Sequence, residues 1–224
     1  MSKIVWDQTG ERYIEAGVDH GVLYPQNANG TYAKGVAWNG LTGVTESPEG
    51  AEANDLWADN IKYASLRSAE TFGGTIEAYQ SPVEFDACDG SVEAAPGVHL
   101  GQQKRAPFGL VYRTKVGNDV TGIDGDDYKL HIIYNATASP SERSYETIND
   151  SPDAITMSWE FDTNPVTVEG YKPLSTLVID SRNADAAKLT ALENLLFGTE
   201  NADPTLPSPA TVISMMGTAQ SQNP

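Results

Sequence analysis

The densest group of potential metal ligands lies in one acidic segment, Asn118–Asp127. Its four aspartates and one asparagine offer the oxygen ligands that hard cations such as Ca²⁺ prefer. The spacing departs from the EF-hand pattern, however, and no glutamate completes the ligand set. The Asp124-Gly125 pair is typical of a tight turn. We therefore favour a solvated hairpin tip between two strands and keep cation binding as the alternative.

Residues for catalysis are sparse. The three histidines, His20, His99 and His131, lie far apart in sequence, and His131 falls on the more polar side of an expected strand. No glycine-rich phosphate loop, nucleophile elbow or His-Glu-x-x-His motif is present. Triad members need not be neighbours in sequence, so a hydrolase on an all-β scaffold remains a third hypothesis. We predict a non-enzymatic protein that uses no metal and no cofactor.

The aromatic and charged residues limit the classes of molecule that the protein is expected to bind. The four tryptophans are scattered along the chain, which favours core or interface anchoring over a stacking platform for sugars or single-stranded nucleic acid. Net charge is −17 although only 20% of residues are charged. This disfavours a nucleic-acid groove, a basic membrane-binding surface and a phosphate site. It is compatible with a surface past which a polyanion moves without binding, and solubility alone is the simpler alternative.

The single cysteine and the hydropathy pattern indicate the cellular compartment in which the protein is made. Cys88 is alone, so neither an intrachain disulfide nor a cysteine cluster for zinc can form. Met1–Trp6 lacks the basic and then apolar run of a signal peptide, and no 18 apolar residues stand together. We expect a soluble protein made in a reducing cytoplasm, without membrane contact.

Most of the chain alternates apolar and polar residues with the period of a half-buried strand. Met157, Trp159 and Phe161 alternate with polar residues, and Tyr128–Tyr134 repeats the pattern. Asn-Gly pairs mark turns, and Gly73-Gly74 indicates a bulge or a close backbone approach. The expected strands are 21–26, 31–38, 41–46, 61–65, 70–79, 97–102, 108–114, 127–136, 154–162, 166–171 and 174–180. We therefore expect a mainly β fold.

Three places have helix signals. Ser81–Glu84 reads as a capping box, and Asn183 is expected to cap a flanking helix at 184–197 that stops at Gly198. Ser208 and Pro209 begin a shorter helix near the C-terminus. We predict one β domain over residues 1–198 including the flanking helix. Residues 199–224 then supply a linker, the short helix and a flexible tail from 220 to 224.

Ser47–Asn60 is too rich in Pro, Gly, Ala and Glu for a strand prediction, so we expect a long loop there. Long ordered loops in compact domains are usually functional. Leu56 and Trp57 could anchor this loop in a pocket of a neighbouring molecule. The alternative is that both side chains fold back onto their own sheet.

Four long runs carry a family resemblance. They are WNGLTGVTESPEGAE (Trp38–Glu52), ADNIKYASLRSAETFGGTIEAYQSPVEF (Ala58–Phe85), GQQKRAPFGLVYRT (Gly101–Thr114) and SPDAITMSWEFDT (Ser151–Thr163). With them the chain resembles, from about Val5 to Met216, the major tail protein (tail tube protein) of long-tailed, non-contractile bacteriophages of Gram-positive hosts.

The resemblance implies a structural virion protein whose fold is a β-sandwich or small barrel of the tail-tube type with a flanking helix. Six-membered rings would join strands of neighbouring copies into one inner barrel. These rings would stack around a tape-measure protein, with tail-tip and terminator proteins as further partners. Phage DNA would later pass through the lumen without specific binding, and assembly would take place in the host bacterial cytoplasm.

In such a tube, three acids and one loop have expected positions. Glu77, Glu160 and Asp162 are the acids expected in the lumen, where negative charge would repel DNA phosphates. The loop with Leu56 and Trp57 is expected to reach the adjacent ring. The rival hypothesis is an immunoglobulin-like adhesion or carbohydrate-binding module, which would stay monomeric and bind glycans.

Overall fold

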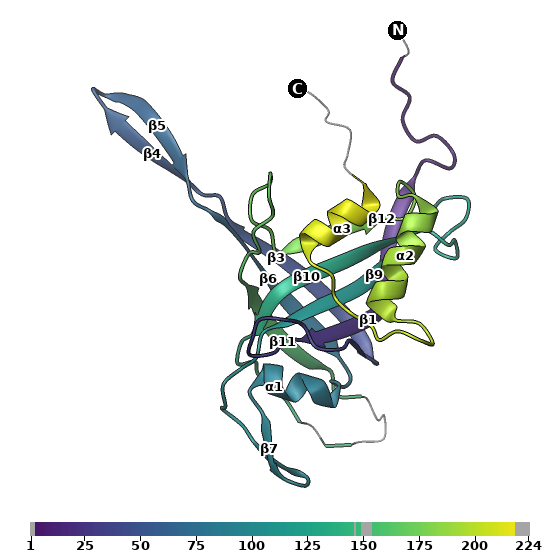
Figure 1. Cartoon of the computed structure of the whole chain (residues 1–224). Coiled ribbons are helices and arrows are strands. Elements are labelled where there is room, and N and C mark those ends of the chain that lie inside the picture. The colour runs from purple at the N-terminus through teal and green to yellow at the C-terminus, as the bar shows by residue number, and fades with distance from the viewer. Residues whose placement is uncertain (1–2, 146, 149–153, 218–224) are drawn as a thin grey trace.

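The computed structural model describes residues 3–145, 147–148 and 154–217, and it is mainly β. Figure 1 shows one large curled sheet, two helices against one of its faces, and two hairpins that project from it. In chain order the elements are β1 (Tyr13–Pro25), β2 (Val36–Ala37), β3 (Leu41–Gly50), β4 (Ala53–Ala58), β5 (Ile61–Arg67), β6 (Glu70–Ala78), η1 (Val83–Phe85), α1 (Asp86–Asp89), β7 (Val92–Ala95), β8 (Val98–Leu100), β9 (Phe108–Asn118), β10 (Tyr128–Ala138), β11 (Met157–Thr163), β12 (Thr176–Asp180), α2 (Ala186–Phe197) and α3 (Pro209–Met216).

The eight-stranded sheet runs β2-β1-β9-β10-β11-β6-β3, with β12 added beside β10. Strand β10 joins the two halves of the sheet: its first half pairs with β9 and β12, and Ala136–Ala138 pair with β11. Between these halves Asn135 adopts a positive φ of 52°, and the register with β9 shifts. This bulge bends the strand, as bulges do. The sheet therefore curls into two layers around a core.

The first core lies between these layers. Trp38, Phe85 and Trp159 form its aromatic centre, with ring centroids 4.7–5.7 Å apart. Aliphatic and aromatic side chains of β1, β6, β9, β10 and β11 complete it, and α1 supplies Cys88. The alternation predicted for β11 is confirmed, because Trp159 and Phe161 are buried while Glu160 and Asp162 are exposed.

A second core lies between the sheet and helices α2 and α3. Leu189, Leu192 and Leu196 of α2 pack on Leu130 and Ile132 of β10, together with Val22 and Tyr24 of β1, Val111 of β9, Tyr134 of β10, Leu206 and Val212. Because the first core covers the other side, β10 is buried on both faces from residue 130 to 134. The prediction of a half-buried strand at this position is therefore wrong.

Two predicted helix caps also need correction. Asp185, not Asn183, caps α2 and accepts a hydrogen bond from the Lys188 amide at 3.0 Å. The Asn183 amide instead donates to the Asp180 carbonyl, so Asn183 belongs to the turn after β12. The Ser81 capping box does not form, because the first turn closes from the Phe85 amide to the Pro82 carbonyl. At α3 the Ser208 cap is confirmed, with Thr211 as donor.

The largest error of the strand prediction is Ser47–Asn60, which is not a loop. Strand β3 continues to Gly50, and β4 then pairs with β5 in a long hairpin. Smaller differences lie elsewhere. The expected strand 31–38 is reduced to β2, the strand 166–171 is reduced to a single bridge, and 97–102 is the second strand of a hairpin whose first strand, β7, the sequence did not predict.

The C-terminal part packs closely on the sheet. The Thr205 amide donates to the Leu195 carbonyl at 2.7 Å, and Leu206 is buried in the second core. A domain division at 198/199 stays a prediction, and the expected flexible tail 220–224 lies outside the described residues. Within the described ranges no helix combines the length and apolar character needed to cross a membrane.

Candidate functional site

The three acids predicted for a lumen lie on one exposed face of the sheet. In the register of β11 with β6, Glu77 lies opposite Ser158, Glu160 opposite Thr75, and Asp162 opposite Gly73. Directly opposed residues of an antiparallel pair share a face. The intervening side chains point into the first core, so this face points away from it. With Glu49 of β3 these three side chains form what we call the acidic face.

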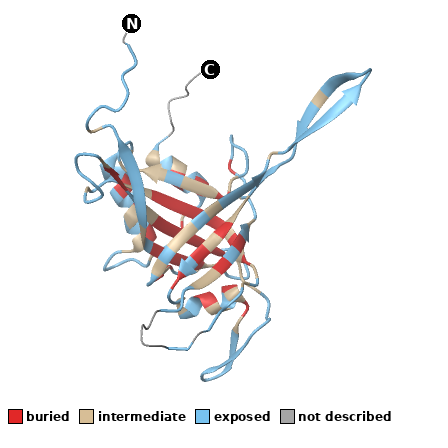
Figure 2. Ribbon diagram, turned by 180° about the vertical axis from the view of Figure 1, so that it is seen from behind, coloured by how far each residue is buried: buried red, intermediate tan, exposed pale blue. Residues whose placement is uncertain are grey.

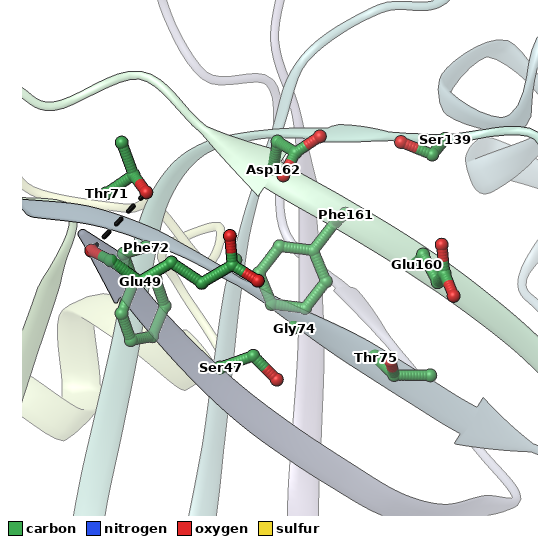
Figure 3. Close-up of a pocket in the computed structure, with 11 residues that line it drawn as sticks. Ser47, Glu49, Thr71, Phe72, Gly74, Thr75, Ser139, Glu160, Phe161 and Asp162 are labelled. Atoms are coloured by element: carbon green, nitrogen blue, oxygen red, sulfur yellow. Dashed lines mark hydrogen bonds between the residues drawn. The ribbon is translucent and has the colours of Figure 1, made fainter.

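The strands of the acidic face carry no positively charged side chain. Strands β3, β6 and β11 contain six acidic residues and neither lysine nor arginine. Between the carboxylates the face presents small or hydroxylated residues, chiefly Ser47, Gly73 and Thr75. Figure 3 shows a hollow on this face, of about 240 Å³, with Glu49, Glu160 and Asp162 among its lining residues. The surface is therefore polar, acidic and without a basic group that could bind phosphate.

The glycine pair in β6 shapes this face. A Cβ on Gly74 would clash with the Thr45 carbonyl oxygen, and would meet the Phe161 ring at 2.8 Å. A Cβ on Gly73 would meet the Phe161 carbonyl oxygen at the same distance. The pairing of β6 with its neighbours continues through both glycines without a register shift. Of the two readings of Gly73-Gly74, the close backbone approach is confirmed and the bulge is wrong.

The β4–β5 hairpin, residues 53–67, extends beyond the sheet as a projecting arm (Figure 1). Its tip is a two-residue turn in which Asp59 and Asn60 both have positive φ, 52° and 62°, the conformation of a type I′ turn. The Leu56 side chain is 41% exposed and the Trp57 side chain 69%. Ile61, Tyr63 and Leu66 of the arm are exposed too, and no arm residue belongs to either core. Leu56 and Trp57 thus do not fold back onto the sheet.

A polar cluster contacts β3, the strand that leads into the arm. Glu46 of β3 points inward, and the Tyr112 hydroxyl of β9 donates to its carboxylate at 2.6 Å. His131 stacks on the Tyr112 ring at 4.7 Å and places Nδ1 3.4 Å from the same carboxylate. The interaction with His131 lowers the pKa of Glu46, more than burial raises it. Burial and the Glu46 carboxylate raise the pKa of Tyr112.

The same cluster resembles a hydrolase triad without functioning as one. Thr114 Oγ1 lies 3.0 Å from His131 Nε2, and Glu46 lies on the other side of the ring. However, the Thr114 hydroxyl donates to Glu15 at 2.6 Å, and the histidine is buried. The hollow on the acidic face contains no histidine. The cluster therefore links β1, β3, β9 and β10 and does not present a nucleophile to a substrate.

The acidic segment 118–127 forms the tip of the β9–β10 hairpin, as favoured from sequence. Asn118 and Gly122 exchange backbone hydrogen bonds of 2.8 and 3.2 Å. The Asn118 side chain accepts from the amides of Val120 and Thr121, and Asp119 accepts from the Gly10 amide. In the part of the chain that the structure describes, no three His, Cys, Asp or Glu side chains gather as metal ligands.

The remaining candidates have separate environments. His20 contacts Asp19 and Arg113, and His99 contacts Asp86. Trp38 and Trp159 anchor the first core, whereas Trp6 and Trp57 are exposed on the N-terminal segment and on the arm. Sequence reasoning did not find the Glu46 cluster, since its members come from four strands. The inward position of Glu46 in the alternation of β3 was the one available signal.

Comparison with known proteins identifies a family for this chain. A family model described as phage tail tube protein matches residues 10–199, a range that contains the acidic face, the arm and α2. No curated protein matches the chain. The predicted resemblance and the predicted lack of enzymatic activity are confirmed by the family match. Since the match covers most of its length, the chain belongs to the phage tail tube protein family, a structural, non-enzymatic family whose members assemble into the virion tail.

Proposed function

We propose that copies of this chain close into six-membered rings, and that these rings stack into a hollow tube with the acidic face toward the lumen. The tube would form around a tape-measure protein in the host cytoplasm, between tail-tip and terminator proteins, and would later conduct phage DNA. The restriction to non-contractile phages of Gram-positive hosts stays a prediction. The observation that carries the proposal is the acidic face, whose strands contain no lysine or arginine.

Electrostatics supports a conduit. A protein binds DNA non-specifically when lysine and arginine neutralise phosphates and release counterions. The acidic face offers no such group, so DNA near it has no phosphate contact to make. Repulsion between carboxylates and phosphates extends about 8 Å at physiological ionic strength. A wall of this kind keeps DNA off the surface without stopping its passage.

The open edge of the sheet supports ring closure. Strand β3 ends the sheet and pairs only with β6 among the described strands. Unpaired edges favour pairing with another chain, and closure into a barrel removes them. In the proposed ring, the β3 edge of each copy meets the sheet of its neighbour. The arm begins where β3 ends, so it leaves the wall and can reach the adjacent ring.

Electron microscopy of the purified protein at increasing concentration tests assembly. We expect rings and then tubes, because edge pairing and arm contacts both become occupied as concentration rises. A protein that stays monomeric at high concentration and binds on a glycan array would contradict the proposal and favour the carbohydrate-binding alternative.

Cysteine accessibility tests the direction of the acidic face. In Glu160→Cys tubes we expect reaction with a small maleimide but not with a maleimide coupled to a protein too large for the lumen. The unassembled variant should react with both reagents, and wild-type protein is the blank because Cys88 is buried. Equal reaction of both reagents with intact tubes would place this face on the outside and refute the lumen assignment.

A further inference from the structure

A second apolar hairpin projects from the molecule besides the arm. Strands β7 and β8 pair through Val92–Leu100 and Ala95–Val98, and we call residues 92–100 the small hairpin. Val92, Val98 and Leu100 are 48%, 52% and 49% exposed. An isolated two-stranded hairpin is marginally stable in water. Three half-exposed aliphatic side chains on such an element indicate a contact surface.

The small hairpin has a defined position on the fold. His99 of β8 places Nδ1 3.3 Å from the Asp86 carboxylate of α1. The chain that follows β8 bonds back to the same region, with the Gln103 amide donating to the Gly90 carbonyl and the Ala106 amide to the Ala87 carbonyl. Within the small hairpin, the Glu93 carboxylate accepts from the Gly97 amide at 2.9 Å. These bonds fix where its apolar side chains are presented.

The arm and the small hairpin lie at opposite ends of the molecule. Figure 1 shows the arm projecting at the upper end and the small hairpin at the lower end, and the view from behind in Figure 2 agrees. A contact between two different surfaces at opposite ends is heterologous, and repetition of such a contact extends an assembly without closing it. This is the geometry that stacking of one layer on the next requires.

We propose that the arm of one copy binds the small hairpin of a second copy in the adjacent ring. The inference rests on the proposed tube and adds the surface that receives the arm. Leu56 and Ile61, which the register of β4 with β5 places on one face of the arm, would cover Val92 and Val98 of the partner copy. Both hairpins would thereby bury apolar side chains that a single copy leaves exposed to water.

Charge supports a second copy as the occupant. Each copy carries a net charge of −17, so most surfaces of two copies repel each other. The arm is an exception, because its two acids, Asp55 and Asp59, are balanced by Lys62 and Arg67. The small hairpin carries a single acid, Glu93, whose carboxylate bonds within the hairpin. These two elements can meet with little repulsion.

The small size of the contact is compatible with tight stacking. Two hairpins bury less surface than the roughly 800 Å² per partner of a standard interface. In a ring, however, every copy presents one arm and one small hairpin, so the contacts form together. Linked sites of this kind gain avidity beyond the single affinity. The contact is therefore expected to be weak between monomers and strong between rings.

Substitution of the small hairpin tests the inference. We expect Val92→Ser/Val98→Ser protein to form rings, with tubes appearing only at a concentration at least about tenfold higher than for wild type, as a hot-spot loss predicts. Val120→Ser, an exposed valine on the β9–β10 hairpin, is the matched control and should form tubes as wild type does. Thermal unfolding of the variant monomer should be unchanged.

A mixing experiment tests whether the arm pairs with the small hairpin. Rings of Leu56→Ser/Ile61→Ser protein lack the arm contact and rings of Val92→Ser/Val98→Ser protein lack its receptor, so neither should stack alone at the concentration at which wild type first forms tubes. Mixed after assembly, they should form pairs of rings and no long tubes, because only one intact junction exists between the two kinds. Full-length tubes from the Val92→Ser/Val98→Ser protein alone at the concentration at which wild type first forms tubes, or no ring pairs on mixing, would overturn the inference. Wild-type protein without rings or tubes would instead refute the proposed function.

Discussion

The curled sheet and the arm are built from the same kind of antiparallel strand, yet their tryptophans have opposite environments. Trp159 is 1% exposed and packs against Trp38 and Phe85, while Trp57 is 69% exposed and contacts neither core. The inner face of the sheet is covered by its own chain, whereas the arm has no cover on either face. Apolar residues of the sheet therefore stabilise the monomer, and those of the arm are available to another molecule.

Removal of the sheet tryptophan is the strongest test of this comparison. Trp159→Ala should lower the free energy of unfolding by about 3–5 kcal/mol, through lost burial and the cavity left behind. Urea denaturation of the monomer measures this. An effect below about 1 kcal/mol would show that the first core does not depend on its aromatic centre.

The close approach at Gly74 gives the next largest effect. Gly74→Ala should cost about 1–3 kcal/mol, because the added Cβ overlaps the Thr45 carbonyl oxygen and the Phe161 ring. Gly101→Ala is the matched control, since no atom lies within 4 Å of its Cβ position. Equal stability of the two variants by urea denaturation would contradict the packing argument.

The polar cluster of Glu46, Tyr112 and His131 should contribute less. Tyr112→Phe removes the hydroxyl that donates to Glu46 at 2.6 Å, and should cost about 1–2 kcal/mol in the free energy of unfolding. Because Glu46 lies on the strand that leads into the arm, amide hydrogen exchange in residues 46–50 should also become faster. Unchanged exchange there would show that the cluster does not hold the end of β3.

The pH dependence of stability tests the contribution of the Glu46 carboxylate to the fold. Its pKa is lower in the folded protein than the ordinary value of 4.5, so its contribution is present above pH 4.5 and is lost as pH falls through the folded pKa. Glu15, whose pKa is also lowered, adds to the same trend. Glu46→Gln should therefore show a shallower fall of stability in acid than wild type. An identical acid profile would contradict the role assigned to His131 as its partner.

The smallest effect on the monomer is expected for the arm tryptophan. Trp57→Ala should change the free energy of unfolding by less than about 0.5 kcal/mol, as for other exposed positions. Tube formation, followed by electron microscopy, should nevertheless weaken markedly. A destabilised monomer would mean that Trp57 supports its own fold, and the comparison between sheet and arm would fail.

Sequence reasoning succeeded where local chemistry decides the structure. The alternation in β11 placed Trp159 and Phe161 inside, and Ser208 with Pro209 marked the start of α3. It failed where the deciding partner is distant. Polar composition concealed β4, because a two-sided exposed hairpin needs no apolar face, and Asn183 was chosen as cap although its amide is used by the turn after β12.

The candidate site shows the same difference between features that local sequence decides and features that depend on distant partners. Glu77, Glu160 and Asp162 were selected from alternation alone, and pairing of β6 with β11 brings them onto one face. The cluster around Glu46, Tyr112 and His131 was not predicted, because sequence spacing carries no information about which side chains of different strands meet.

By itself, the sequence determined which side chains of each strand are apolar, the scarcity of cations and the absence of a catalytic motif. Period-two patterns fix the two faces of a strand, whatever its neighbours are. Only the tertiary structure decided that β10 is buried twice, that β3 is left at an edge and that the arm stands free. These features depend on which strands pair, and pairing is set by packing of the whole sheet.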